Sequence, residues 1–194
     1  MTARRVAADA DVGTRWVALL RGVNVGGVAV RNPELTAVVE GIGGTDVRPV
    51  LASGNVVFTA PAPDAGPEHA LAQDAAEATL RHRLERGLQD RFGRPVRVVL
   101  VRQDRLAALV DAFPFPVDAA THAYVVFSSD QDALEALVAD PVEPPDRVAV
   151  GDGVVYWACP KGSSTDTPFA KRAATSRFRA TTTTRNVNTL RRMA

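Results

Sequence analysis

Apolar stretches with two different periods divide the chain into alternating strands and helices. Residues 17–20 form a continuous apolar run, which is typical of a strand buried on both faces. Further along, Leu80, Leu84 and Leu88 lie four positions apart, as on one face of a helix, and Gly93 can end that helix. Such patterns predict strands at 17–20, 47–51, 56–59 and 96–101, with helices at 32–42 and 67–92. The order β-α-β-β-α-β is the ferredoxin-like plan.

The same order then repeats in the rest of the chain. Asp152-Gly153, between two apolar runs, is a strong hairpin signal and resembles the turn at Ser53-Gly54-Asn55. The second set comprises helices at 104–112, 130–139 and 167–174, strands at 122–128, 147–150, 154–158 and 180–183, and a final helical turn at 186–193. The sequence therefore predicts an α+β fold of two ferredoxin-like halves in one compact chain. We expect a flexible leader (1–13), a first half (14–102) and a second half (103–194) that ends in the helical turn.

The composition of the chain indicates its cellular compartment and the partners that it does not attract. The chain has 194 residues, of which 46% are hydrophobic, and a formal net charge of +1, so no overall field draws it to nucleic acid or to a membrane. Cys159 is the single cysteine, which excludes an internal disulfide and favours a reducing compartment. No apolar run approaches the roughly 20 residues that cross a bilayer. These features predict a cytoplasmic protein that does not associate with membranes.

Three short polar segments carry the candidate chemistry: 21–27, 53–55 and 184–189. Arginine can bind a phosphate or a carboxylate through two parallel hydrogen bonds, asparagine offers a donor and an acceptor, and glycine lets backbone amides approach an anion. The first and third strands of a β-α-β-β-α-β sheet are central neighbours, so the first two segments should meet; the position of the third is left open. The candidate ligand-binding residues are Arg21, Asn24, Gly26, Gly27, Ser53, Gly54, Asn55, Arg185, Asn186 and Asn188.

In this order, the three motifs resemble the bacterial family catalogued as domain of unknown function 1697. The resemblance runs from Arg15 to Arg192 and implies a two-part α+β fold of ferredoxin-like halves, but it implies no biochemical activity. The chain departs from the usual pattern at residues 30–33, where a lysine-valine-x-methionine run is common. It also has Ala52 in place of glutamine and Val187 in place of tryptophan. If those residues contact a ligand in relatives, the ligand of this protein could differ.

The favoured function is the binding of a phosphate-bearing or other anionic ligand, with nucleotides and nucleic acids among the candidates. RNA-binding domains of ferredoxin-like plan stack bases on sheet aromatics, and here the strands offer six rings: Trp16, Phe58, Tyr124, Phe127, Tyr156 and Trp157. The arginines from Arg81 to Arg94, with Arg97 and Arg102, would supply the charge, but a solvated helix face is the favoured explanation for them. The alternatives are an enzyme acting on a small anionic metabolite, and a structural, dimerising protein. A monomer and a homodimer are both compatible with the sequence.

The motifs contain no group that titrates near neutral pH, so the question of catalysis stays open. Asp46, Asp152 and Tyr156 are the nearest candidates for such a group. No cofactor motif is present, and the three histidines have no metal-ligand spacing, so no cofactor or metal is predicted. Ordinary structural roles compete at every position: turns for the glycines, caps for Asn186 or Asn188, a carboxylate partner for Arg21, and core packing for Cys159.

Overall fold

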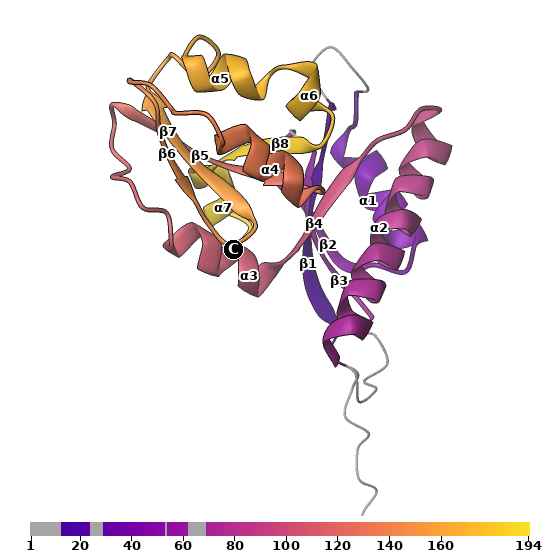
Figure 1. Ribbon diagram of the computed structural model, residues 1–194. Helices are drawn as coiled ribbons and strands as arrows, with labels where there is room; N and C mark the ends of the chain where they lie inside the picture. Colours follow the sequence, from indigo (N-terminus) through magenta and orange to yellow (C-terminus); the bar gives the residue numbers. More distant parts are fainter. Residues whose placement is uncertain (1–12, 24–28, 53, 62–68) are drawn as a thin grey trace, which may run out of the picture.

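The chain forms two four-stranded antiparallel sheets, each with its own helices (Figure 1). The computed structural model describes residues 13–23, 29–52, 54–61 and 69–194. The first sheet and its helices comprise β1 (Thr14–Leu20), α1 (Asn32–Gly41), β2 (Thr45–Pro49), β3 (Asn55–Ala60), α2 (His69–Phe92) and β4 (Val98–Arg102). The remaining elements are α3 (Gln103–Asp111), β5 (Thr121–Ser128), α4 (Gln131–Val138), β6 (Arg147–Val150), β7 (Val154–Pro160), α5 (Pro168–Ala173), α6 (Ser176–Arg179), β8 (Thr182–Asn186) and α7 (Val187–Arg191).

The α+β class predicted from the sequence is confirmed, and the two sheets share one strand order. The first sheet runs β2-β3-β1-β4 and the second runs β6-β7-β5-β8, so equivalent strands occupy equivalent places. In each sheet the central pair is antiparallel: β1 with β3, and β5 with β7. Except for Gly13, the expected leader lies outside the described residues, as does the expected start of the long helix at Pro67.

Two differences from the predicted elements affect the site. The four-residue helix α6 was not predicted, because it is too short to produce a helical period. Strand β8 continues to Asn186, whereas the β-branched run predicted a strand that ends at residue 183. Arg185 and Asn186 therefore lie on a strand, and their side chains point to opposite faces of the second sheet.

Both faces of the central strand β1 are buried, which explains its unbroken apolar run. Trp16, Ala18 and Leu20 pack in the core beneath α1 and α2, while Val17 and Leu19 face the second sheet. Figure 1 shows α1 and α2 on the side of the first sheet that faces away from the second. The period of two along a strand assigns alternate residues to the two cores.

The inner faces of the two sheets share one hydrophobic core, to which α3 and α7 contribute. Val99 and Val101 of β4 lie in it with Val125 and Phe127 of β5. Leu106, Leu109 and Val110 come from α3, and Val187, Leu190 and Met193 come from the C-terminal segment. The side-chain amide of Gln103 donates to the carbonyl oxygen of Met193 at 2.7 Å, which fixes the end of the chain to the start of α3, directly after β4. The core between the sheets holds the two halves in one arrangement.

Asp146 is a buried carboxylate in the outer core of the second sheet. Its side chain is 6% exposed and accepts two hydrogen bonds, from the indole N–H of Trp157 at 2.7 Å and from the backbone N–H of Phe169 at 2.8 Å. These bonds tie the segment before β6 to β7 and to the start of α5. Because both donors are buried, removing the carboxylate would leave them without an acceptor.

We expect Asp146→Ala to lower the free energy of unfolding by about 2–4 kcal/mol, since it leaves two buried donors without an acceptor. The measurement is urea unfolding followed by tryptophan fluorescence. Asp166→Ala, which removes an exposed carboxylate just before α5, is the control. Equal stabilities of the two variants would contradict the assigned role of Asp146.

Candidate functional site

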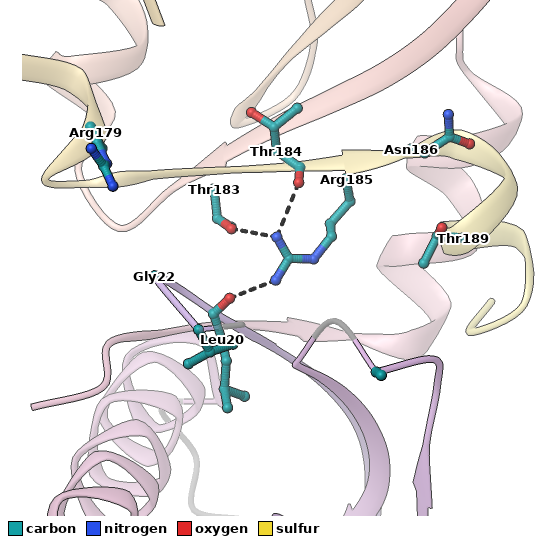
Figure 2. Close-up of a pocket in the computed structure, with 10 residues that line it drawn as sticks. Leu20, Gly22, Arg179, Thr183, Thr184, Arg185, Asn186 and Thr189 are labelled. Atoms are coloured by element: carbon teal, nitrogen blue, oxygen red, sulfur yellow. Dashed lines mark hydrogen bonds between the residues drawn. The ribbon is translucent and has the colours of Figure 1, made fainter. Parts of the chain in front are cut away.

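Arg185 of β8 extends from the second sheet to the first and connects the sequence motifs (Figure 2). Its Nη2 donates to the carbonyl oxygen of Leu20 at 2.6 Å, and its Nε donates to Oδ1 of Asn55 at 2.6 Å. Its Nη1 donates to the hydroxyl of Thr183 at 2.7 Å and to the carbonyl oxygen of Thr184 at 3.0 Å. All four acceptors are uncharged. Burial lowers the pKa of Arg185 to about 10, so the side chain is still charged at neutral pH.

The first-half partners of Arg185 lie where β1 ends and β3 begins. Leu19 pairs with Asn55, and the N–H of Leu20 donates to the carbonyl oxygen of Gly54 at 2.8 Å. Gly54 has a φ of +69°, and a Cβ there would lie 2.5 Å from Val23 Cγ2 and 3.0 Å from Leu20 Cβ. Only glycine suits that conformation and that space. The predicted meeting of the first two motifs is therefore correct for their described residues.

A cavity of about 320 Å³ opens beside this contact, and we call it the arginine cavity. It is lined by Arg21, Gly22, Arg94, Pro95, Arg97, Arg179, Thr182 and Thr183. The pairing of β1 with β4 ends at Leu20 and Val98. The next two residues continue it, because the N–H of Arg21 donates to the carbonyl oxygen of Arg97 at 2.8 Å, and this brings the two arginines together. Arg179 comes from the other half, at the end of α6.

The charges of the arginine cavity are largely uncompensated. Arg97 forms an ion pair of 2.8 Å with Glu85 of α2, and the other carboxylate oxygen of Glu85 accepts from the N–H of Val98. The guanidinium groups of Arg21, Arg94 and Arg179 form no hydrogen bond or ion pair with any described residue. The pKa of Arg21 is lowered, first by burial and second by the positive charge of Arg97, while Glu85 acts in the opposite direction. The cavity therefore favours an anion.

A second cavity of about 500 Å³ adjoins the first, and we call it the threonine cavity. It is lined by Leu20, Gly22, Val23, Ala52, Arg179, Thr183, Thr184, Arg185, Asn186 and Thr189. Gly22, Arg179 and Thr183 line both cavities, so the two form one cleft between the halves. Figure 2 shows Arg185 and Thr183 directed toward Leu20, whereas the side chains of Thr184 and Asn186 point away from it.

The cleft contains some of the predicted site residues but not all of them. Arg21 lines the arginine cavity, Arg185 lines the threonine cavity, and Asn55 is bonded to Arg185. Asn186 caps α7 by accepting from the N–H of Asn188 at 2.9 Å, which is the structural alternative considered above. Asn188 is exposed, accepts from Arg191 and lies outside both linings. Four further predicted residues lie outside the described residues: Asn24, Gly26, Gly27 and Ser53.

Sequence reasoning did not select Arg179, and it assigned Arg94 and Arg97 to a solvated helix face. Arg94 and Arg97 follow α2 in the first half, whereas Arg179 lies just before the third motif in the second half, so the packing of the halves brings Arg179 to the other two. The one sequence signal for Arg179 was its place in a short basic stretch just before a β-branched run.

Among the described residues, none that lines the cleft has a side chain that titrates near neutral pH. The three groups that the sequence suggested lie elsewhere. Asp46 on β2 accepts from the hydroxyl of Thr59, and Asp152, in the turn between β6 and β7, pairs with Arg105 of α3. Tyr156 is buried between the sheets, where its hydroxyl donates to the carbonyl oxygen of Leu109, and burial raises its pKa.

The sheet aromatics do not form a surface for stacking bases. Tyr124 is half-buried and the other five rings are less than one-tenth exposed, because the helices cover one face of each sheet and the opposite sheet covers the other. Within the described ranges, no three histidine, cysteine or acidic side chains are grouped to hold a metal ion. The described helices also include none with the length and apolar character to cross a membrane.

Comparison with known proteins assigns the chain to a family. A scan against family models matches residues 14–156 to the family described as "Protein of unknown function (DUF1697)". The chain belongs to this family. The matched range includes the first two motifs of the DUF1697 resemblance, whereas Arg185 and its neighbours lie beyond it.

A solved structure supports the fold assignment over nearly the whole chain. It is described as the structure of the conserved bacterial protein SP0830 from Streptococcus pneumoniae, and it is 20% identical with a TM-score of 0.64. The likeness covers 93% of this chain and 96% of that one. At this identity, the likeness applies to the fold alone. A search of curated proteins found no match.

Replacing Arg185 should weaken the contact between the sheets. We expect Arg185→Ala to lower the free energy of unfolding by about 3 kcal/mol, because four hydrogen bonds of a half-buried guanidinium are lost. Urea unfolding measures this, with Arg191→Ala, which removes an exposed arginine of α7, as the control. If both variants unfold at the same urea concentration, Arg185 does not hold the halves together.

Cys159 should be unreactive in the folded protein. It is 2% exposed, and burial, with a smaller contribution from Asp146, raises its pKa to about 11. At pH 8 about 0.1% of such a thiol is ionised, against roughly a quarter of an unperturbed cysteine, so thiol labelling should be at least 100-fold slower than in urea. The labelling rate of the folded protein should also rise about tenfold per pH unit between pH 8 and 10. Rapid labelling at pH 8 would contradict this placement.

Proposed function

We propose that this protein binds an anionic ligand, held by a phosphate group, in the cleft between its two halves. The observation that carries the proposal is the set of guanidinium groups of Arg21, Arg94 and Arg179. They line one cavity and have no hydrogen-bond or ion-pair partner among the described residues. Each offers several N–H donors in a planar fork that matches phosphate oxygens.

The pairing of Arg21 with Arg97 strengthens the proposal. Like charges directly opposite each other on neighbouring strands are destabilising, and these two lie opposite where β1 meets β4. Four arginines and the one carboxylate of Glu85 leave the cavity with a net charge of +3. A bound phosphate dianion would offset most of that charge, and its binding would reverse the effect of Arg97 on the pKa of Arg21.

Binding is favoured over catalysis by the chemistry of the lining. Arginine, threonine, asparagine and apolar side chains orient and stabilise a charged ligand, but none of them exchanges a proton near neutral pH. An enzyme acting on a small anionic metabolite is the second candidate. It would use the same arginines for orientation and would need a proton acceptor supplied by the substrate or by water.

The proposal includes a finer description of the architecture and location. We infer that 14–102 and 103–194 are two ferredoxin-like halves, supported by the shared strand order of the two sheets. Their open faces meet each other, so the ligand lies at one end of the joint core rather than across a sheet. A cytoplasmic location agrees with the single unpaired cysteine.

Substituting a cleft arginine should weaken phosphate binding without unfolding the protein. We expect Arg21→Gln and Arg94→Gln each to raise the dissociation constant for inorganic phosphate about tenfold, since each removes a charged donor. Isothermal titration calorimetry measures the constants. Arg86→Gln, which removes an exposed arginine of α2 outside the cleft, is the matched control and should bind as the unmodified protein does.

Two results would overturn the proposal. One is that the unmodified protein binds neither inorganic phosphate nor any phosphate ester. The other is that phosphate binding weakens as much in Arg86→Gln as in Arg21→Gln, which would indicate general charge attraction instead of a site.

A further inference from the structure

The two cavities of the cleft differ in chemistry, and this difference restricts the shape of the ligand. The arginine cavity supplies uncompensated positive charge at one end. At the other end, the guanidinium of Arg185 is also charged, but it already donates four hydrogen bonds to the protein and retains little capacity to donate to a ligand. A ligand that fills both cavities therefore has its anionic group, which accepts hydrogen bonds from free guanidinium groups, in the arginine cavity, and an uncharged end in the threonine cavity.

The lining of the threonine cavity indicates the character of the uncharged end. Leu20, Val23 and Ala52 form its apolar part on the first-half side. On the second-half side, Thr189 brings a hydroxyl group, which both donates and accepts, while the hydroxyl of Thr183 already accepts from Arg185 and can still donate. An apolar surface facing hydroxyl groups suits a compact body that has carbon faces and hydroxyl groups, such as a sugar or a nucleoside.

The dimensions agree with a small ligand. The cavities of about 320 and 500 Å³ each lie in the range typical of small-molecule sites. A nucleic acid strand would need a positive track with exposed rings, and the rings of the sheets are buried. The observations therefore favour a discrete molecule over a polymer.

We propose that the ligand is a phosphate monoester of a small hydroxylated molecule. The phosphate lies among Arg21, Arg94 and Arg179, and the uncharged body lies in the threonine cavity against Thr189 and Val23. This inference rests on the proposed function and adds the recognition of the body. It assigns Thr189 as a specificity-determining residue that touches the body and not the phosphate.

The test compares inorganic phosphate with two esters, ribose 5-phosphate and adenosine 5′-monophosphate, by isothermal titration calorimetry. We expect at least one ester to bind about tenfold more tightly than inorganic phosphate, because the body adds contacts in the second cavity. Ester binding should strengthen from pH 5.5 to 7.5, as the second ionisation of the phosphate, with a pKa of about 6, is completed.

Variants that fill the threonine cavity separate recognition of the body from that of the phosphate. Thr189→Leu should abolish the tenfold advantage of the ester and leave the affinity for inorganic phosphate unchanged. Ala52→Leu fills the threonine cavity from the first-half side and should also abolish the advantage of the ester. It is the second variant because it leaves α7 unchanged. The matched control is Thr79→Leu, the same substitution on the exposed face of α2. Thermal unfolding confirms that each variant is folded.

The outcomes distinguish this inference from the proposed function. If phosphate and both esters bind equally and Arg21→Gln weakens all three, the anion site stands and the inference about the body is wrong. If a single-stranded oligonucleotide binds more tightly than both esters and is unaffected by Thr189→Leu, the ligand is a nucleic acid. If no phosphate compound binds, both proposals fail.

Discussion

The hydrogen bonds of Arg185 are the interaction on which the arrangement of the cleft depends. A guanidinium on the last strand reaches the carbonyl oxygen of Leu20 and the amide of Asn55, more than 100 residues earlier in the chain. The shared apolar core presses the sheets together, but apolar packing is not directional. The hydrogen bonds of Arg185 have defined geometry, so they fix how the polar end of the interface is aligned. One residue of the third motif thus contacts the second motif and the residue that precedes the first.

The position of the cleft follows from the alternation of side chains along the strands. Val17 and Leu19 lie on the inner face of β1, and Arg21, the residue after the strand, lines the arginine cavity, so the apolar core gives way to charge where that strand ends. Thr183 and Arg185 occupy the inner face of β8 in the same way. The cleft is the polar continuation of the core between the sheets, and this explains why residues of both halves line it. It also explains why Arg21 is half-buried and the other three cavity arginines are exposed: they lie where the packed layers end.

The fold could be predicted from the sequence largely because each strand and most helices carry a local signal. The run before Arg21, the Asp152-Gly153 turn and the leucines of α2 each indicate one element, and the repeated order indicates two similar sheets. The site could be predicted only in part. Gly54 and Asn55 were selected because turn residues between two strands stand out, but Asn186 proved to cap α7. Arg179 could not be selected, because its role depends on how the two halves pack, and no local pattern records that packing.

The most direct test of the anion site is to observe its arginine side chains while phosphate is added. Two-dimensional NMR of the arginine Nε–H groups resolves each one in the folded protein. We expect saturable shifts at Arg21, Arg94 and Arg179, with little change at Arg185, whose Nε–H is already bonded to Asn55. If these three signals do not move, or if they move no more than that of Arg86, an exposed residue of α2 outside the cleft, the cleft does not bind phosphate and the account of its function is wrong.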